Sequence, residues 1–217
     1  MIKEKRKCLV LRKYGHIGDL LMMTPALEIF SKNNEITLQI PEEYIEIFSN
    51  LTFIKEVVGL DKELNLADYN KFIDLSDFEF NYEHIHQPII NKTKLELFAD
   101  GLNVTLDKKI PIINLSEEEK DKAERFISGL NKRKTILLAP SSENPSRDWP
   151  LNNWKNLIEM LKSTSYNLII VDKKLRWEDK EVIFFNATSL RELFALASKS
   201  DIIITQDSGL LHIGAAF

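Results

Sequence analysis

Short apolar runs alternate with helical patterns along all 217 residues, and this alternation limits the folds that the chain can adopt. Runs rich in Ile, Val and Leu predict strands at residues 8–12, 35–40, 53–60, 71–75, 135–139, 168–171, 182–185 and 202–205. Helical patterns stand between many of them, most clearly at residues 15–31, 116–130, 151–161 and 189–198. Strands separated by helices predict parallel sheets with helices on both faces, so we expect an α/β fold.

A polar region in the middle of the chain indicates the domain boundary. Ser116 and Glu119 have the spacing of a capping box, which predicts the start of a helix, and polar segments flank this helix on both sides. We therefore predict two Rossmann-like lobes. The parts are residues 1–115 as the N-terminal lobe, 116–132 as a connecting helix and 133–217 as the C-terminal lobe.

Composition argues against several classes of protein. The formal net charge of −4 gives no support to a nucleic-acid partner. The single cysteine, Cys8, stands in an apolar run and cannot pair within the chain, which is typical of a reducing compartment. No apolar run in this sequence is long enough to cross a bilayer, and we expect no signal peptide. We expect a cytoplasmic protein, whose basic residues 3–7 are either a solvated tail or a peripheral contact with the inner membrane surface.

The first candidate site follows the first predicted strand. Gly15 and Gly18 allow close backbone approach at the carboxyl end of that strand, where open α/β sheets bind ligands. The segment matches neither the P-loop nor the dinucleotide fingerprint. Asp19 stands at a predicted helix start. It either stabilises the helix terminus or serves as a general base that faces a cleft.

The second candidate site follows the strand at residues 135–139. Arg147 is a candidate phosphate clamp, because a guanidinium group binds phosphate oxygens in bidentate fashion, and Ser141 and Ser142 can add hydroxyl donors. The alternative is a solvated turn in which Trp149 packs and Pro150 starts the next helix.

The third candidate site follows the strand at residues 202–205. A strand that enters a helix through Asp207, Ser208 and Gly209 brings backbone N–H groups and a helix N-terminus to one point, which favours phosphate. His212, one turn later, can donate to the same group. Alternatively, Asp207 or Ser208 caps the helix and His212 packs in the core. We expect this helix still to be running at Phe217.

Metal ligands form no recognisable pattern. His84 and His86 are two residues apart, but no third ligand stands at a suitable spacing, and such pairs are usually surface histidines. We therefore expect neither a metal nor a cofactor.

The three sites together resemble glycosyltransferase family nine, the heptosyltransferases of the lipopolysaccharide core. The first site carries Gly18-Asp19-Leu20-Leu21 with Thr24-Pro25-Ala26-Leu27. The matching stretches occur in the same order and at similar spacing, at residues 11–27, 138–154 and 207–216. In the family, further elements follow the last stretch, so we expect the C-terminal lobe to be incomplete, without its last strand.

The resemblance implies a GT-B architecture with the active site between two Rossmann-like lobes. It also implies inverting, metal-independent transfer of a sugar, typically from ADP-heptose, to a hydroxyl of a lipid-linked saccharide acceptor. The roles that it implies are the catalytic base for Asp19, a donor-phosphate contact for Arg147, the acidic residue near the donor sugar for Asp207 and the diphosphate-binding turn for Ser208, Gly209 and His212. Glu178 or Asp179 is the candidate for holding the donor ribose.

Two rival functions stay open at the level of sequence. One is a relative that binds a nucleotide sugar, or a fragment of such an enzyme, without catalysis. The other is a different doubly wound enzyme, such as a nicotinamide oxidoreductase, against which the missing G-x-G-x-x-G motif argues.

Overall fold

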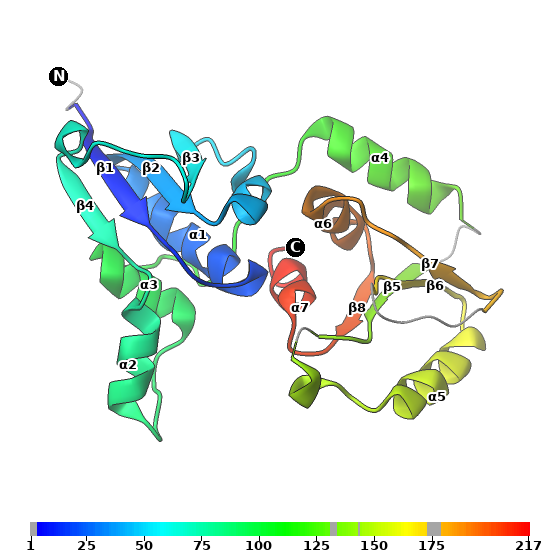
Figure 1. Ribbon diagram of the computed structural model, residues 1–217. Helices are drawn as coiled ribbons and strands as arrows, with labels where there is room; N and C mark the ends of the chain where they lie inside the picture. The colour runs from blue at the N-terminus through cyan, green and yellow to red at the C-terminus, as the bar shows by residue number, and fades with distance from the viewer. Residues whose placement is uncertain (1–3, 131–133, 143, 173–178) are drawn as a thin grey trace. The chain divides into compact units, whose positions relative to one another are not determined.

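The chain forms two compact units, Met1–Asn114 and Leu115–Phe217, in a computed structural model that describes residues 4–130, 134–142, 144–172 and 179–217. Each unit is built on its own four-stranded parallel sheet (Figure 1). The α/β class predicted from the alternation of strands and helices is therefore confirmed.

The sheet of the first unit has the strand order β3-β2-β1-β4. Consecutive strands β1, β2 and β3 extend in one direction, and β4 then returns to the other side of β1. The carboxyl ends of β1 and β4 consequently flank the point where the strand order reverses, which is the usual ligand position in open α/β sheets. The strand bounds are Arg6–Leu11 for β1, Asn34–Ile40 for β2, Glu56–Gly59 for β3 and Lys71–Asp74 for β4.

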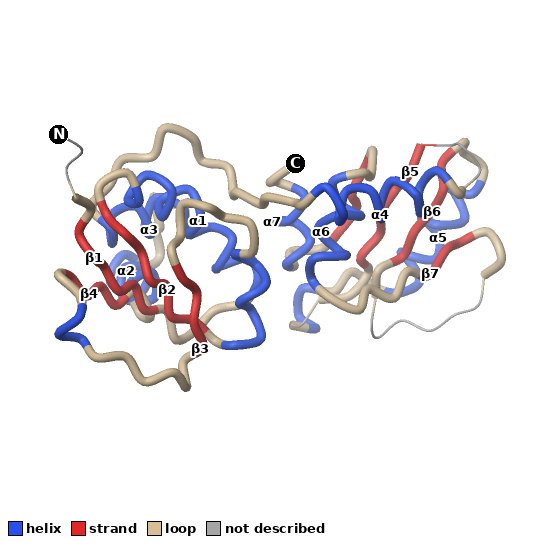
Figure 2. The backbone as a smooth tube through the Cα atoms, turned by 90° about the horizontal axis from the view of Figure 1, so that it is seen from above, coloured by secondary structure: helices blue, strands red, loops and turns tan. Residues whose placement is uncertain are grey.

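Two helices of the first unit, α1 (Ile17–Ser31) and α3 (Lys94–Leu102), pack against each other (Figure 2). Pro25 lies inside α1 and removes the hydrogen bond that Leu21 would otherwise accept from residue 25. The hydroxyl of Thr24 donates to the Leu21 carbonyl at 2.7 Å instead. The helix therefore continues past the proline with this buried carbonyl satisfied.

The sheet of the second unit repeats the same arrangement, with the order β7-β6-β5-β8. Here the carboxyl ends of β5 and β8 flank the reversal point. The bounds are Lys134–Ala139 for β5, Tyr166–Ile170 for β6, Val182–Phe184 for β7 and Ile202–Thr205 for β8.

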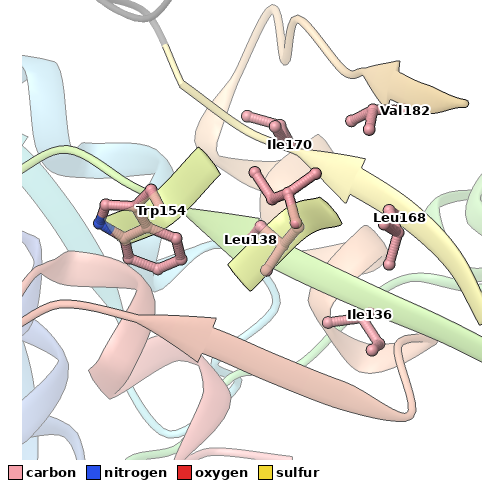
Figure 3. Close-up of a cluster of buried hydrophobic side chains, with 7 residues drawn as sticks. Ile136, Leu138, Trp154, Leu168, Ile170 and Val182 are labelled. Atoms are coloured by element: carbon pink, nitrogen blue, oxygen red, sulfur yellow. The ribbon is translucent and has the colours of Figure 1, made fainter. Parts of the chain in front are cut away.

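A buried apolar cluster holds α5 (Leu151–Lys162) on the sheet of the second unit. Figure 3 shows this cluster, in which Trp154 of α5 lies near Leu138 of β5, with further side chains from β5, β6 and β7. Helix α5 connects β5 to β6, whereas α6 (Leu190–Ser198) connects β7 to β8 and so runs back across the sheet. Because both crossovers are right-handed, α6 lies on the face opposite to α5. Helix α4 (Glu117–Ser128) packs against α6 within this unit.

The structure changes several predicted elements. All eight predicted strands are present, seven of them with shifted ends and the one at residues 202–205 as predicted. The segment between β2 and β3 contains the 3-10 helix η1 (Glu42–Phe48). The sequence prediction missed α3 and gave no element for α2 (Phe78–His86). Helix α7 (Gly209–Gly214) ends with Ala215 as its C-cap, so the prediction that it still runs at Phe217 is wrong. The reason is that the amides of residues 216 and 217 bond three residues back, as in a 3-10 turn.

Candidate active site

The loop after β1 brings together the three residues predicted there. Gly15 has a φ of +124°, a conformation that glycine adopts much more easily than other residues. His16 is the N-cap of α1, and its backbone N–H donates to Asp19 Oδ2 at 3.0 Å. Gly18 lies between them, buried in the first turn. Asp19 therefore stabilises the helix start, as one of the two interpretations of this residue predicts.

The second carboxylate oxygen of Asp19 has a different partner. Lys94 Nζ, at the start of α3, lies 2.6 Å from Asp19 Oδ1, and the two side chains are 34% and 17% exposed. Burial raises the pKa of Asp19, but the hydrogen bonds from Lys94 and His16 and the charges of Lys94 and Arg12 outweigh it, so that the pKa lies below its ordinary value. The group is thus an ionised carboxylate at neutral pH, with a lysine as its counter-ion.

The carboxyl end of β4 lies next to that of β1, because Asp74 is aligned with Leu11 in the parallel ladder. Ser76 ties the two ends together: its hydroxyl accepts from the backbone N–H of Lys13 at 3.0 Å and donates to Asp74. Burial raises the pKa of Asp74, but hydrogen bonds from the Ser76 side chain and amide, together with Lys13, lower it more. This edge of the first sheet therefore holds two ionised carboxylates and two lysines.

In the second unit, Gln206 links the ends of β5 and β8. Its amide Nε2 donates to the Pro140 carbonyl and, at 3.2 Å, to Asp148 Oδ1, and its Oε1 accepts from the backbone N–H of Trp149. Asp148 also accepts from the backbone N–H of Ser142 at 2.8 Å. The loop with the second predicted site is thereby fixed to the loop with the third.

Arg147 and Asp207, predicted in separate loops, meet at this junction. Arg147 Nη1 lies 3.2 Å from Asp207 Oδ2 and donates to the Asp207 carbonyl at 3.5 Å. Both side chains are more than half exposed, so the ion pair itself is weak and exchangeable. Ser141 precedes this loop and is partly buried, whereas the neighbouring Ser142 is buried and donates to the Asn144 carbonyl at 2.6 Å.

The turn into α7 contains the remaining predicted residues. Ser208 is the N-cap, but its side chain makes no capping hydrogen bond and lies 2.9 Å from the Thr205 hydroxyl instead. Gly209 is the first residue of α7, and His212 follows on its next turn, partly exposed. The alternative prediction was that the side chain of Asp207 or Ser208 caps this helix, and it is wrong.

The two residues predicted to hold a ribose are Glu178 and Asp179. Glu178 lies outside the described residues. Asp179 forms a largely buried ion pair with Lys162 of α5, and the hydrogen bond from Lys162 is the main cause of its lowered pKa. A ribose would thus have to compete with this lysine for Asp179.

Three residues at the two sheet edges were not predicted as site residues from the sequence. Lys94, Gln206 and the buried Arg12 each contact groups more than 50 residues away. The capping box of Thr93 and Glu96 is the one local signal that could have located Lys94, since it marks the start of α3. No group of three or more potential metal ligands lies together in the described ranges.

The fold and the two polar edges define the class of protein. Two parallel-sheet α/β lobes, each with charged residues at its strand reversal point, are the lobes of a GT-B type glycosyltransferase. The family model of glycosyltransferase family 9 (heptosyltransferase) matches residues 48–217. The chain therefore belongs to glycosyltransferase family 9.

Individual relatives agree with this assignment. The chain is 26% identical over 128 residues to the lipopolysaccharide core heptosyltransferase OpsX of Haemophilus influenzae, a match that covers 54% of this chain and 36% of the relative. The chain thus spans little more than a third of the length of that curated relative.

Solved structures share the fold. The ADP-heptose lipopolysaccharide heptosyltransferase II of E. coli superposes with a TM-score of 0.75 at 18% identity, covering 97% of this chain and 82% of that chain. The dodecameric, iron-containing heptosyltransferase TibC of enterotoxigenic E. coli, solved in complex with ADP-D-β-D-heptose, gives 0.73 at 16% identity, covering 99% and 56%. None of the helices in the described parts of the chain is both long and apolar enough to span a membrane.

Proposed function

We propose that the chain transfers a sugar, heptose, from ADP-heptose to a hydroxyl group of a lipopolysaccharide-core or related acceptor, with inversion and without a metal. The observation that carries the proposal is the placement of Asp19. It is an ionised, mostly buried carboxylate at the strand reversal point of the first unit, in a chain of the heptosyltransferase family. A lipid-linked acceptor would place the reaction at the cytoplasmic face of the inner membrane.

The chemistry that we propose is a direct displacement at the anomeric carbon. The acceptor oxygen forms a bond to that carbon, the bond to the diphosphate oxygen breaks, and Asp19 takes the acceptor proton. The low pKa makes Asp19 a weak base, so the proton moves late, when the new bond has made the hydroxyl acidic. Loss of activity in acid should then begin only below the ordinary aspartate pKa of about 3.9.

The second unit would bind the donor in this scheme. Arg147 and His212 would direct positive charge or hydrogen-bond donors at the leaving diphosphate. Ser208 and Gly209, in the turn into α7, would contact the same diphosphate. Asp207 would face the donor sugar, and Ser141 would add a hydroxyl. The exposed pair of Arg147 and Asp207 supports this assignment, because a phosphate can displace the carboxylate from the guanidinium at little cost.

Replacing Asp19 tests the proposal. We expect Asp19→Asn to lower the turnover of ADP-heptose with a lipopolysaccharide-core acceptor by about 100-fold or more, because the base is lost. ADP should still raise the melting temperature of the variant, since ligand at 100 times its Kd stabilises the folded state by about 2.7 kcal/mol. Product formation is measured by mass spectrometry, and ADP release is measured in parallel.

The matched control is Asp68→Asn, an exposed aspartate on the 3-10 helix η2 (Leu66–Asp68). It should leave turnover unchanged. Turnover retained by Asp19→Asn would refute the role of this residue. Donor binding without product in the parent chain, across several acceptors, would support a non-catalytic relative instead.

A further inference from the structure

A buried arginine stands directly before the loop that carries Asp19. Arg12 follows β1 and is 2% exposed. Its Nη1 donates to the carbonyls of Leu75 and Ser76 at 2.6 and 2.9 Å. Both of its terminal nitrogens also contact the carboxylate of Glu79 in α2, so the guanidinium is held in a single orientation by the segment after β4.

The other edge of the same guanidinium faces the loop. Arg12 Nη2 and Nε lie 3.1 and 3.4 Å from the point where a side chain at Gly15 would place its Cβ atom. The Cβ atom of Asp19 lies 3.1 Å from that same point, so Arg12 and Asp19 flank Gly15. Within the described residues, Nε is buried and has no hydrogen-bond partner. A side chain at residue 15 would therefore crowd both Arg12 and Asp19.

A second route joins Arg12 to Asp19 through helix α3. The guanidinium carbon of Arg12 lies 5.3 Å from the ring centre of Phe98, a fully buried residue of α3. Lys94 lies four residues earlier and therefore on the same face of α3, where it contacts Asp19. One buried cation thus supports both the loop that holds Asp19 and the helix that holds its counter-ion.

Stability alone does not account for such a group. A buried ion pair is often no more stabilising than apolar side chains of similar size, and an unpartnered buried N–H is unfavourable. We propose that Arg12, oriented by Glu79, is a positioning residue that fixes the Gly15–Asp19 turn and α3 so that Asp19 and Lys94 stay in contact. Its consequence for transfer rests on the proposed function, but its effect on the geometry around Asp19 does not.

The test is the double variant Arg12→Met/Glu79→Leu, which replaces the buried ion pair with apolar side chains of similar volume. Its readouts are a thermal melt, an NMR titration of the Asp19 carboxyl carbon and the kinetics of transfer. The groups that face Asp19 are Lys94 from α3, Arg12 from the segment after β1 and the backbone N–H of His16 from its own helix cap. We expect a cooperative melt, a higher pKa for Asp19 and a kcat at least tenfold lower, with the KM for the donor unchanged.

The matched control is Arg191→Met/Glu119→Leu, which removes the two-bonded ion pair between α4 and α6 in the second unit. It should leave the Asp19 titration as in the parent. A folded Arg12→Met/Glu79→Leu chain with the parent's Asp19 titration and kcat would overturn the proposal.

A second variant covers the case in which the double variant does not fold. Arg12→Lys keeps the charge but loses the planar second edge toward Gly15. We expect it to fold, to raise the pKa of Asp19 because the contact with Lys94 is loosened, and to lower kcat at least tenfold. An unchanged Asp19 titration with full kcat would overturn the positioning role. If Asp19→Asn keeps its turnover, the proposed function fails, but the NMR titration still decides whether Arg12 acts on Asp19.

Discussion

At the scale of single residues, Gly15 is the position where a missing side chain matters most. Its φ of +124° and the atoms of Arg12 and Asp19 around it leave no room for a methyl group without strain. We expect Gly15→Ala to lower the free energy of unfolding by about 1–3 kcal/mol. Urea denaturation measures this change.

The control is Gly129→Ala, at the C-cap of α4. Gly129 has a φ of −72°, and a Cβ atom there would meet its nearest neighbours at an ordinary 3.4 Å. This variant should be neutral or more stable by about 0.4–1 kcal/mol, because alanine restricts the unfolded chain. Equal losses in both variants would show that the backbone conformation of Gly15 carries no special strain.

The predictable part of the site was the part encoded locally. Gly15 and Asp19 could be identified because glycines and an acidic helix start follow a strand within a few residues. Lys94, Glu79 and Gln206 could not, because their partners Asp19, Arg12 and Pro140 are 75, 67 and 66 residues away in the chain. Such pairs depend on which strands become neighbours, and the local pattern does not specify that.

At the scale of elements, an ion pair between Arg191 and Glu119 helps to attach α4 to α6. Arg191 donates two hydrogen bonds of 2.7 Å to Glu119, and they are the main reason that the pKa of Glu119 falls to about 2. The folded state therefore favours the ionised carboxylate. Its contribution is complete above the ordinary pKa of 4.5 and is lost as the pH falls from there toward 2.

We expect Glu119→Gln to lower the free energy of unfolding at pH 7 by about 1.5–3 kcal/mol. Glutamine can still complete the capping box with Ser116, so the loss reports the charge. The difference from the parent should shrink between pH 4.5 and 2, as measured by denaturant titrations across that range. Glu117→Gln, in an exposed pair with Lys120, should change little, and a gap that stays constant with pH would contradict this account.

Elements with a strong period were predictable, and short or polar ones were not. The strands β1, β5 and β6 appear as apolar runs because they are mostly buried, as is usual for the inner strands of a parallel sheet. Helix α2 exposes much of its apolar surface, including Phe80 at 65% and Ile85 at 74%, so it lacks the usual helical stripe. Residues 42–48 have an apolar face but form a 3-10 helix, a distinction that side-chain spacing over two turns does not resolve.

At the scale of the whole molecule, the two units share one topology. Both sheets follow the pattern third-second-first-fourth in their own strand order. The alternation of strands and helices predicts two parallel sheets, but not this order, which follows from where the fourth strand of each unit returns. The return beside the first strand creates the reversal point at which Asp19 lies in one unit and Asp207 in the other.

Because each unit has a core of its own, a cavity in one core should destabilise that unit in particular. Leu38 of β2 and Leu138 of β5 are both fully buried, one in each unit. We expect Leu38→Ala and Leu138→Ala each to cost about 2–5 kcal/mol, from lost burial and an unfilled cavity. Hydrogen exchange with mass spectrometry should show lost protection at residues 4–114 for the first variant and at residues 115–217 for the second. Equal loss in both units from either variant would show instead that they unfold as one cooperative body.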